Sequence, residues 1–183
     1  FPDYFQHVVS TPEEAAQQTY ELADAGVDVI KTWAGMSENM MRAVVGAAHE
    51  RGIQVHSHLY SPDELWSAIR AGTDVIQHAG SAGNPPYSHD LVQKIAHSGI
   101  PVVQTIAHRP WVYQATVEFP ERLQDRRLVE TLPPALYEEF QRSFQDFRRL
   151  SYFRTTPQQV RKSQLSAGQF IEANVVMGMG TDS

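Results

Sequence analysis

Short apolar runs rich in β-branched residues alternate along the chain with longer segments in which polar and apolar residues are mixed. A strand is expected in each apolar run, and the runs are 27–31, 53–58, 73–78, 100–105 and 175–179. Most intervening segments open with a Ser or Thr cap and close at a glycine, which predicts helices over 11–26, 37–52, 61–72 and 88–99. Strands and helices that alternate at this spacing are typical of parallel α/β architecture.

The alternation is interrupted once, after Ala107. Residues from about 109 to 156 are rich in aromatics, contain Pro133-Pro134, and include a stretch with mixed aromatic and charged positions that predicts a helix over 135–153. A further helix opens at Thr156-Pro157 and leads to the last strand. We therefore predict one domain, residues 1–183, with a helical insertion at about 109–156, on the side where strands end.

The strand count is low for a closed barrel. An eight-stranded α/β barrel takes about 250 residues, so a chain of 183 residues with five strands is short by roughly three strand-helix units. The chain is 42% hydrophobic and 20% charged, which is ordinary for one globular domain. We expect a partial TIM (β/α)8 barrel with open sheet edges, in a protein that continues at both ends.

Four of the apolar runs end in, or lead into, a side chain able to bind or bridge a metal ion. These residues are Lys31, His56, His78 and Asp182. The carboxyl ends of parallel strands meet at one edge of the sheet, and in α/β barrels that edge carries the chemistry. His58 lies two residues after His56, so both imidazoles face the same side of an extended strand. The pattern predicts a metal site at this edge.

Each of these residues also has an ordinary structural explanation when it is taken alone. A histidine at a strand end is often a hydrogen-bonded core residue, Lys31 can pair with a carboxylate, and Asp182 can cap a following helix. The two histidines, however, recur one strand-helix repeat apart. This recurrence, with Asp182 at another strand end, favours the metal site.

The motifs VDVIK with Lys31, VHSHLYSPDELWSAIRAGTDVIQHAG with His56 and His78, and MGTDS with Asp182 together resemble the amidohydrolase superfamily, in its imidazolonepropionase-like and prolidase-like branch. The resemblance implies that the strands are the fourth to eighth of the family barrel, with the insertion after the seventh. It also implies that carbon dioxide carboxylates Lys31, which bridges two divalent metals. His56 and His78 would bind the second metal, and Asp182 would hold the first metal and the attacking water.

The resemblance has one departure, because the family's His-x-His pair on the first strand is absent from this chain. Half of the expected metal shell is therefore missing. Of the remaining residues, His58 is expected to bind substrate or orient the oxyanion, or instead to support a ligand by a hydrogen bond. His108 is a second candidate for substrate contact, and Asp182 is expected to accept the proton of the attacking water.

These features predict a metal-dependent hydrolase of C–N bonds in amides, cyclic amides or dipeptides, with the chain as given inactive without the first-strand histidines. One or two divalent ions are expected, zinc first, although the ligands also suit iron and manganese. Two alternatives remain open. One is a noncatalytic α/β binding module of the same fold, and the other is a metal-free lyase that uses Lys31 as a Schiff-base amine.

Charge and composition limit the classes of molecule that this chain is expected to bind. The net charge of −6 argues against nucleic acid and anionic membranes, and the absence of cysteine excludes disulfides, thiolate zinc sites and a cysteine nucleophile. A small-molecule or dipeptide-like substrate fits better. No apolar run has the length of a membrane span and no signal-peptide core is present, so the compartment stays open. Open sheet edges predict association with a second copy or with a complementary half of the barrel.

Overall fold

The computed structural model describes residues 7–81, 86–145 and 154–182. Five strands form one sheet in the order β1-β2-β3-β4-β5, and each pairs in parallel with the next. Their bounds are β1 Val29–Thr32, β2 Gln54–His58, β3 Val75–Gln77, β4 Val102–Gln104 and β5 Met177–Met179. The predicted parallel α/β sheet is confirmed, and within the described residues β1 and β5 leave its two edges open.

Helix α1 (Pro12–Asp24) precedes β1. The first four strands are connected by α2 (Glu38–Glu50), α3 (Pro62–Ala71) and α4 (His89–Ser98). Each begins directly after a predicted cap whose hydroxyl accepts a hydrogen bond from a backbone N–H of the first turn; the caps are Thr11, Ser37, Ser61 and Ser88. The helix before β5 is α9, Thr156–Glu172. No helix in the described ranges combines the length and apolar character needed to cross a bilayer.

All five strands are shorter than the apolar runs that predicted them. The first residue of a run still completes the preceding helix: the N–H of Ile53 bonds to the carbonyl of Ala48, and that of Val175 bonds to the carbonyl of Phe170. These bonds satisfy the last carbonyls of a helix, so the chain extends into the sheet only one or two residues later. His78 likewise lies just after β3 rather than inside it.

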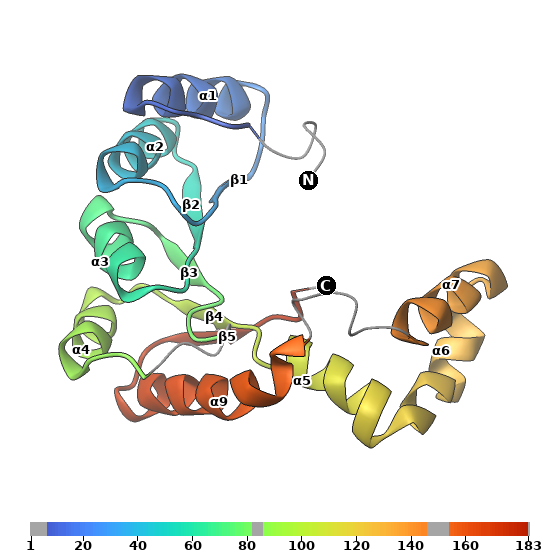
Figure 1. The fold of residues 1–183 in the computed structure, drawn as a ribbon. Helices are drawn as coiled ribbons and strands as arrows, with labels where there is room; N and C mark the ends of the chain where they lie inside the picture. The colour runs from blue at the N-terminus through green and yellow to red at the C-terminus, as the bar shows by residue number, and fades with distance from the viewer. Residues whose placement is uncertain (1–6, 82–85, 146–153, 183) are drawn as a thin grey trace.

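The two faces of the sheet differ in what covers them. Ile30, Val55, Ile76 and Val102 are buried, and they belong to a core shared with helix residues that include Met41, Leu65, Leu91 and Phe170. Figure 1 shows α1 to α4 and α9 along the outer side of a curved sheet. Because side chains alternate along a strand, Lys31, His56, His58 and Gln77 belong to the other, inner face.

The predicted insertion lies between β4 and α9. It consists of α5 (His108–Tyr113), the π-helical turn η2 (Gln114–Glu118), the 3-10 turn η3 (Pro120–Gln124), α6 (Arg126–Thr131) and α7 (Pro134–Gln145). It begins one residue before the predicted start at 109, because the carbonyl of Ala107 already accepts a helical hydrogen bond from Trp111. These helices extend away from the sheet (Figure 1). Residues 146–153 of the predicted helix lie outside the described residues.

Candidate metal centre

His58, His78 and Asp182 come together at the carboxyl ends of neighbouring strands. His58 is the last residue of β2, His78 follows β3, and Asp182 follows β5. The ring centroids of His58 and His78 lie 4.5 Å apart. The Nε2 atom of His78 lies 3.6 Å from Oδ1 of Asp182. Three predicted site residues from different strands therefore share one small region.

The backbone is left-handed at two of these residues, with φ of 68° at His78 and 58° at Asp182. In an extended strand, side chains two residues apart point to the same face of the sheet. His78 would then face the helices, as the buried Ile76 does. The left-handed turn breaks this alternation and brings the ring beside His58. Such a conformation costs a non-glycine residue about 1–2 kcal/mol. Strain of this kind tends to collect at functional sites.

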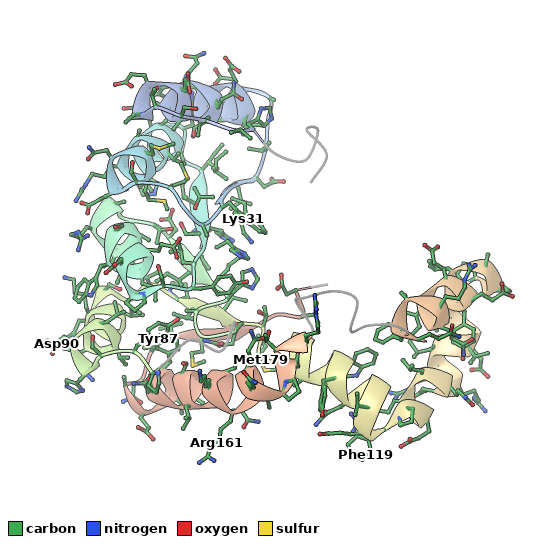
Figure 2. All side chains as sticks on the ribbon, viewed as in Figure 1. Lys31, Tyr87, Asp90, Phe119, Arg161 and Met179 are labelled. Carbon is green, nitrogen blue, oxygen red and sulfur yellow. The ribbon has the colours of Figure 1, made fainter. Side chains whose placement is uncertain are left out.

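Lys31 and His56 form a second group on the inner face and are register partners on β1 and β2. The amide of Gln77 joins them. Its Oε1 accepts a hydrogen bond from Nζ of Lys31, and its Nε2 lies 3.0 Å from Nδ1 of His56. Figure 2 shows Lys31 on the side of the sheet away from α2 and α3. The histidine that lies against His78 is thus His58, whereas His56 is engaged with Gln77.

Aromatic side chains surround His58. Trp33, which follows β1, stacks on its ring with centroids 4.0 Å apart and an interplanar angle of 10°. Tyr60 meets it edge-on at 4.8 Å. His58 itself is buried, and its Nδ1 atom has no hydrogen-bond partner among the described residues. A buried nitrogen of this kind is costly unless a further group binds it.

Burial lowers the pKa of three basic groups of the site. It lowers the pKa of His58 to about 4, and the nearby His78 and Lys31 add to this effect. Burial is also the main cause that lowers the pKa of Lys31, against the opposing charge of Asp182. The pKa of His56 is lowered by burial and by Lys31. Neutral imidazole is the form that binds metal, and a neutral amine is the form that adds carbon dioxide or a carbonyl.

The residues fit part of a metal shell. The 3.6 Å gap between His78 and Asp182 is longer than a hydrogen bond, but two ligands on one tetrahedral ion, each about 2.1 Å from it, lie about 3.4 Å apart. The buried Nδ1 of His58, whose ring centroid lies 4.5 Å from that of His78, is a further candidate ligand. Within the described ranges, no three His, Cys, Asp or Glu side chains are already grouped as a metal site. The described side chains therefore include candidate ligands, but fewer than a complete metal site requires.

Two polar residues of the site were missed by sequence reasoning, Gln77 and Thr105. Gln77 lies beside His58 in the strand register and bridges Lys31 and His56. Thr105 follows β4, and its Oγ1 lies 2.9 Å from Nδ1 of His78. Strand parity marks Gln77 as inward-facing, and the apolar run 100–105 ends at Thr105, so both had a usable signal. Neither is a usual metal ligand by residue type, so the pattern of metal-binding residues does not include them.

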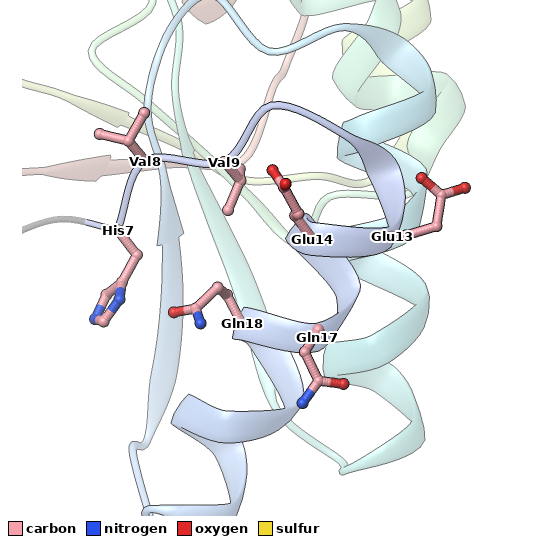
Figure 3. Close-up of a pocket in the computed structure, with 7 residues that line it drawn as sticks. All are labelled: His7, Val8, Val9, Glu13, Glu14, Gln17 and Gln18. Carbon is pink, nitrogen blue, oxygen red and sulfur yellow. The ribbon is translucent and has the colours of Figure 1, made fainter.

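His108 is not tested as a substrate contact. Its backbone opens α5, directly after β4, but its side chain lies outside the described part of the chain. A separate surface hollow of about 820 Å³ lies elsewhere, between residues 7–9 and α1 (Figure 3). None of the predicted site residues lines it.

The chain has no match among protein-family models or curated protein sequences. Its fold does match solved structures. An amidohydrolase superposes with a TM-score of 0.69 at 22% identity, over 96% of this chain and 38% of the other. A prolidase solved with N-methylphosphonate-L-proline gives 0.69 at 20% identity, over 96% and 39%. A Xaa-Pro dipeptidase with bound methionine gives 0.63 at 19%, over 96% and 39%.

These identities are low, so the likeness concerns the fold. The chain spans about two fifths of the length of the structures that it matches. Five parallel strands with intervening helices account for that part, and the predicted partial barrel is confirmed. The chain therefore has the fold of one part of the α/β barrels seen in these structures.

Proposed function

We propose that this chain carries half of a divalent-metal centre that hydrolyses C–N bonds in small amide or dipeptide-like substrates. The observation that carries the proposal is the placing of His78 between the ring of His58 and the carboxylate of Asp182 at the strand ends. The fold gives further support, because the solved structures that it resembles include an amidohydrolase, a prolidase and a dipeptidase.

The ligands in this proposal are Lys31, His58, His78 and Asp182. His58 takes the place that the sequence assigned to His56, because His58 lies against His78 and has a buried nitrogen without a partner among the described residues. His56 then supports Lys31 through Gln77. The lowered pKa of Lys31 favours the neutral amine that carbamate formation requires. Zinc is the first metal to test, since imidazole and carboxylate both suit it.

The bound metal would lower the pKa of a water molecule and polarise the carbonyl of the substrate. The protein's own groups supply the rest. Asp182 accepts the proton of the attacking water and passes it to the leaving nitrogen. The low pKa of His58 keeps its imidazole neutral at physiological pH. Trp33 and Tyr60 shield that imidazole from water.

The proposal is tested on the intact protein, by which we mean this chain together with the barrel strands that it is expected to lack. Elemental analysis measures its metal content, and assays on Xaa-Pro dipeptides and cyclic amides measure its activity. We expect about one or two transition-metal ions per chain. His78→Asn and Asp182→Asn should each lower kcat/KM by about three orders of magnitude or more, with the circular dichroism spectrum preserved. A parallel pair, His58→Asn and His56→Asn, decides the ligand assignment, because only the first should release metal.

His49→Gln is the matched control. His49 lies in α2 and pairs with Asp74 at 2.9 Å, away from the candidate site, so its loss should leave metal content and turnover unchanged. A metal-free intact protein, or full turnover in the His78→Asn variant, would contradict the proposal.

A second candidate function is Schiff-base chemistry at Lys31. The lowered pKa of this lysine favours it, since a neutral amine is the nucleophile that attacks a carbonyl carbon. Borohydride would trap the imine as a stable adduct on Lys31. Adduct formation in metal-free protein would favour this function, whereas activity that depends on bicarbonate would favour the metal centre.

A further inference from the structure

A buried chain of hydroxyl groups leads away from His78 behind the candidate metal centre. Nδ1 of His78 lies 2.9 Å from Oγ1 of Thr105, and this hydroxyl donates to Oγ of Ser81 at 3.1 Å. Both hydroxyl residues are buried, with exposed fractions of 3% for Thr105 and 9% for Ser81. The contact therefore operates away from solvent, where a hydrogen bond has a strong effect on the group it holds.

The position of Ser81 is fixed from two sides. Its N–H donates to the carbonyl of His78 at 2.8 Å, which closes the turn after β3. Its own carbonyl accepts a hydrogen bond of 3.2 Å from the hydroxyl of Ser163 in α9. The acceptor for the Thr105 proton is thus held in place by the turn and by α9.

The direction of these hydrogen bonds selects one tautomer of His78. A threonine hydroxyl has one proton, and Thr105 donates it to Ser81. Oγ1 of Thr105 can then only accept from His78, so the imidazole proton resides on Nδ1. The lone pair is left on Nε2, the atom that faces Asp182 at 3.6 Å.

Thr105 also contacts the segment that carries Asp182. A Cβ added to Gly180 would lie 3.3 Å from Cγ2 of Thr105, so the methyl group packs closely against this glycine. The N–H of Gly180 donates to the carbonyl of Gln104 at 2.8 Å. The side chain of Thr105, directly after β4, therefore contacts His78 through its hydroxyl. Its methyl group contacts the segment that leads to Asp182.

We infer that Thr105 is a positioning residue, which fixes His78 as the Nδ1–H tautomer and presents its Nε2 lone pair beside Asp182 for a cation. The inference rests on the proposed function for the role of that lone pair, but the tautomer itself is a property of the metal-free protein. A hydrogen bond of this type to a metal-binding histidine commonly changes metal affinity about 10–100-fold.

The test compares three variants of the intact protein, each examined without and with zinc. Thr105→Val removes the hydroxyl and keeps the shape, Thr105→Ser keeps the hydroxyl and removes the methyl, and Ser81→Ala removes the acceptor. Nitrogen NMR of labelled imidazoles reads the tautomer of metal-free protein, with the His78 signal assigned by its loss in His78→Gln. Competition with a chelator reads the zinc affinity.

The parent and Thr105→Ser should show the Nδ1–H form. Thr105→Val and Ser81→Ala should lose that preference and bind zinc about 10–100-fold more weakly. Thr73→Val is the matched control, because Thr73 is a buried threonine whose hydroxyl bonds to Ser57 and to the carbonyl of Val55 on the helix side. It should change neither the tautomer nor the affinity.

The outcomes separate this inference from the proposed function. An unchanged tautomer in Thr105→Val would overturn the inference, even when the parent binds zinc tightly. A parent that binds no metal would overturn the proposed function, while the NMR result would still decide the role of Thr105. An Nε2–H form in the parent would overturn the inference directly.

Discussion

The sheet with its covering helices and the helical insertion differ in how they are held together. In the sheet region, α2, α3 and α4 each bury at least three residues, and the strand residues that face these helices are almost fully buried. In the insertion, neither α6 nor α7 has a buried residue, and apolar side chains such as Phe119, Val129 and Leu136 are 40–50% exposed. Stability in the first region comes from tertiary burial, whereas the second relies on local contacts.

Local contacts in the insertion are nevertheless specific. Phe140 and Phe144 pack with ring centroids 4.6 Å apart, and Trp111 meets Phe144 edge-on at 6.1 Å. The hydroxyl of Tyr137 donates to the carbonyl of Leu123, which ties α7 to η3. The comparison teaches that the candidate metal centre depends on the sheet region, because its described side chains lie within strands or shortly after them.

The largest expected effect comes from a comparison of one leucine substitution in each region. Leu65→Ala in α3, where the side chain is 0% exposed, should lower the free energy of unfolding by about 2–5 kcal/mol. Leu136→Ala in α7, where the side chain is 50% exposed, should change it by less than about 0.5 kcal/mol. Urea unfolding of the intact protein measures both. Equal losses would show that the insertion is part of the same core.

A glycine substitution two residues after His78 tests whether α9 belongs to the sheet region. Gly80 has φ of 80°, and a Cβ there would lie 2.5 Å from Cβ of Ser166 in α9. Gly80→Ala should cost about 2–4 kcal/mol through strain and overpacking. Gly26→Ala, at a similar φ of 89° with open space around it, should cost about 1–2 kcal/mol. Thermal unfolding compares the two, and equal costs would mean that α9 does not pack on the turn.

The smallest effect concerns helix caps. Ser61 and Glu64 form a capping box at α3, so Ser61→Ala should lower the global free energy of unfolding by about 1 kcal/mol. Asp125 caps α6 by accepting from the N–H of Arg127 at 2.9 Å. Asp125→Ala should only speed hydrogen exchange within α6, because that helix buries nothing. A drop in the global melting temperature of the Asp125 variant would contradict this distinction.

Much of the sheet region was predictable from local signals. The caps Thr11, Ser37, Ser61 and Ser88 and the apolar runs between glycines placed the four helices and the order of the strands, because capping and hydrophobic periodicity act over a few residues. Strand ends were less predictable. Ile53 reads as part of a strand in the sequence, but its N–H is used by the end of α2.

The candidate site was predictable in residue type but not in pairing. The sequence singled out His56 and His78 by their spacing along the chain, whereas the fold brings His58 against His78 and leaves His56 with Gln77. The reason is the left-handed backbone at His78, which the pattern of polar and apolar residues does not predict. The role of Thr105 depends on the same turn, because the turn places the ring of His78 within hydrogen-bond distance of the Thr105 hydroxyl.

Taken alone, the sequence determined the order of strands and helices and the kinds of chemical group at the strand ends, because these follow from interactions between near neighbours in the chain. Only the tertiary structure decided which imidazole lies beside Asp182, how deeply each basic group is buried, and which hydroxyl holds His78. Those properties arise from residues far apart in the chain, whose distances are set by sheet register and by backbone turns rather than by local composition.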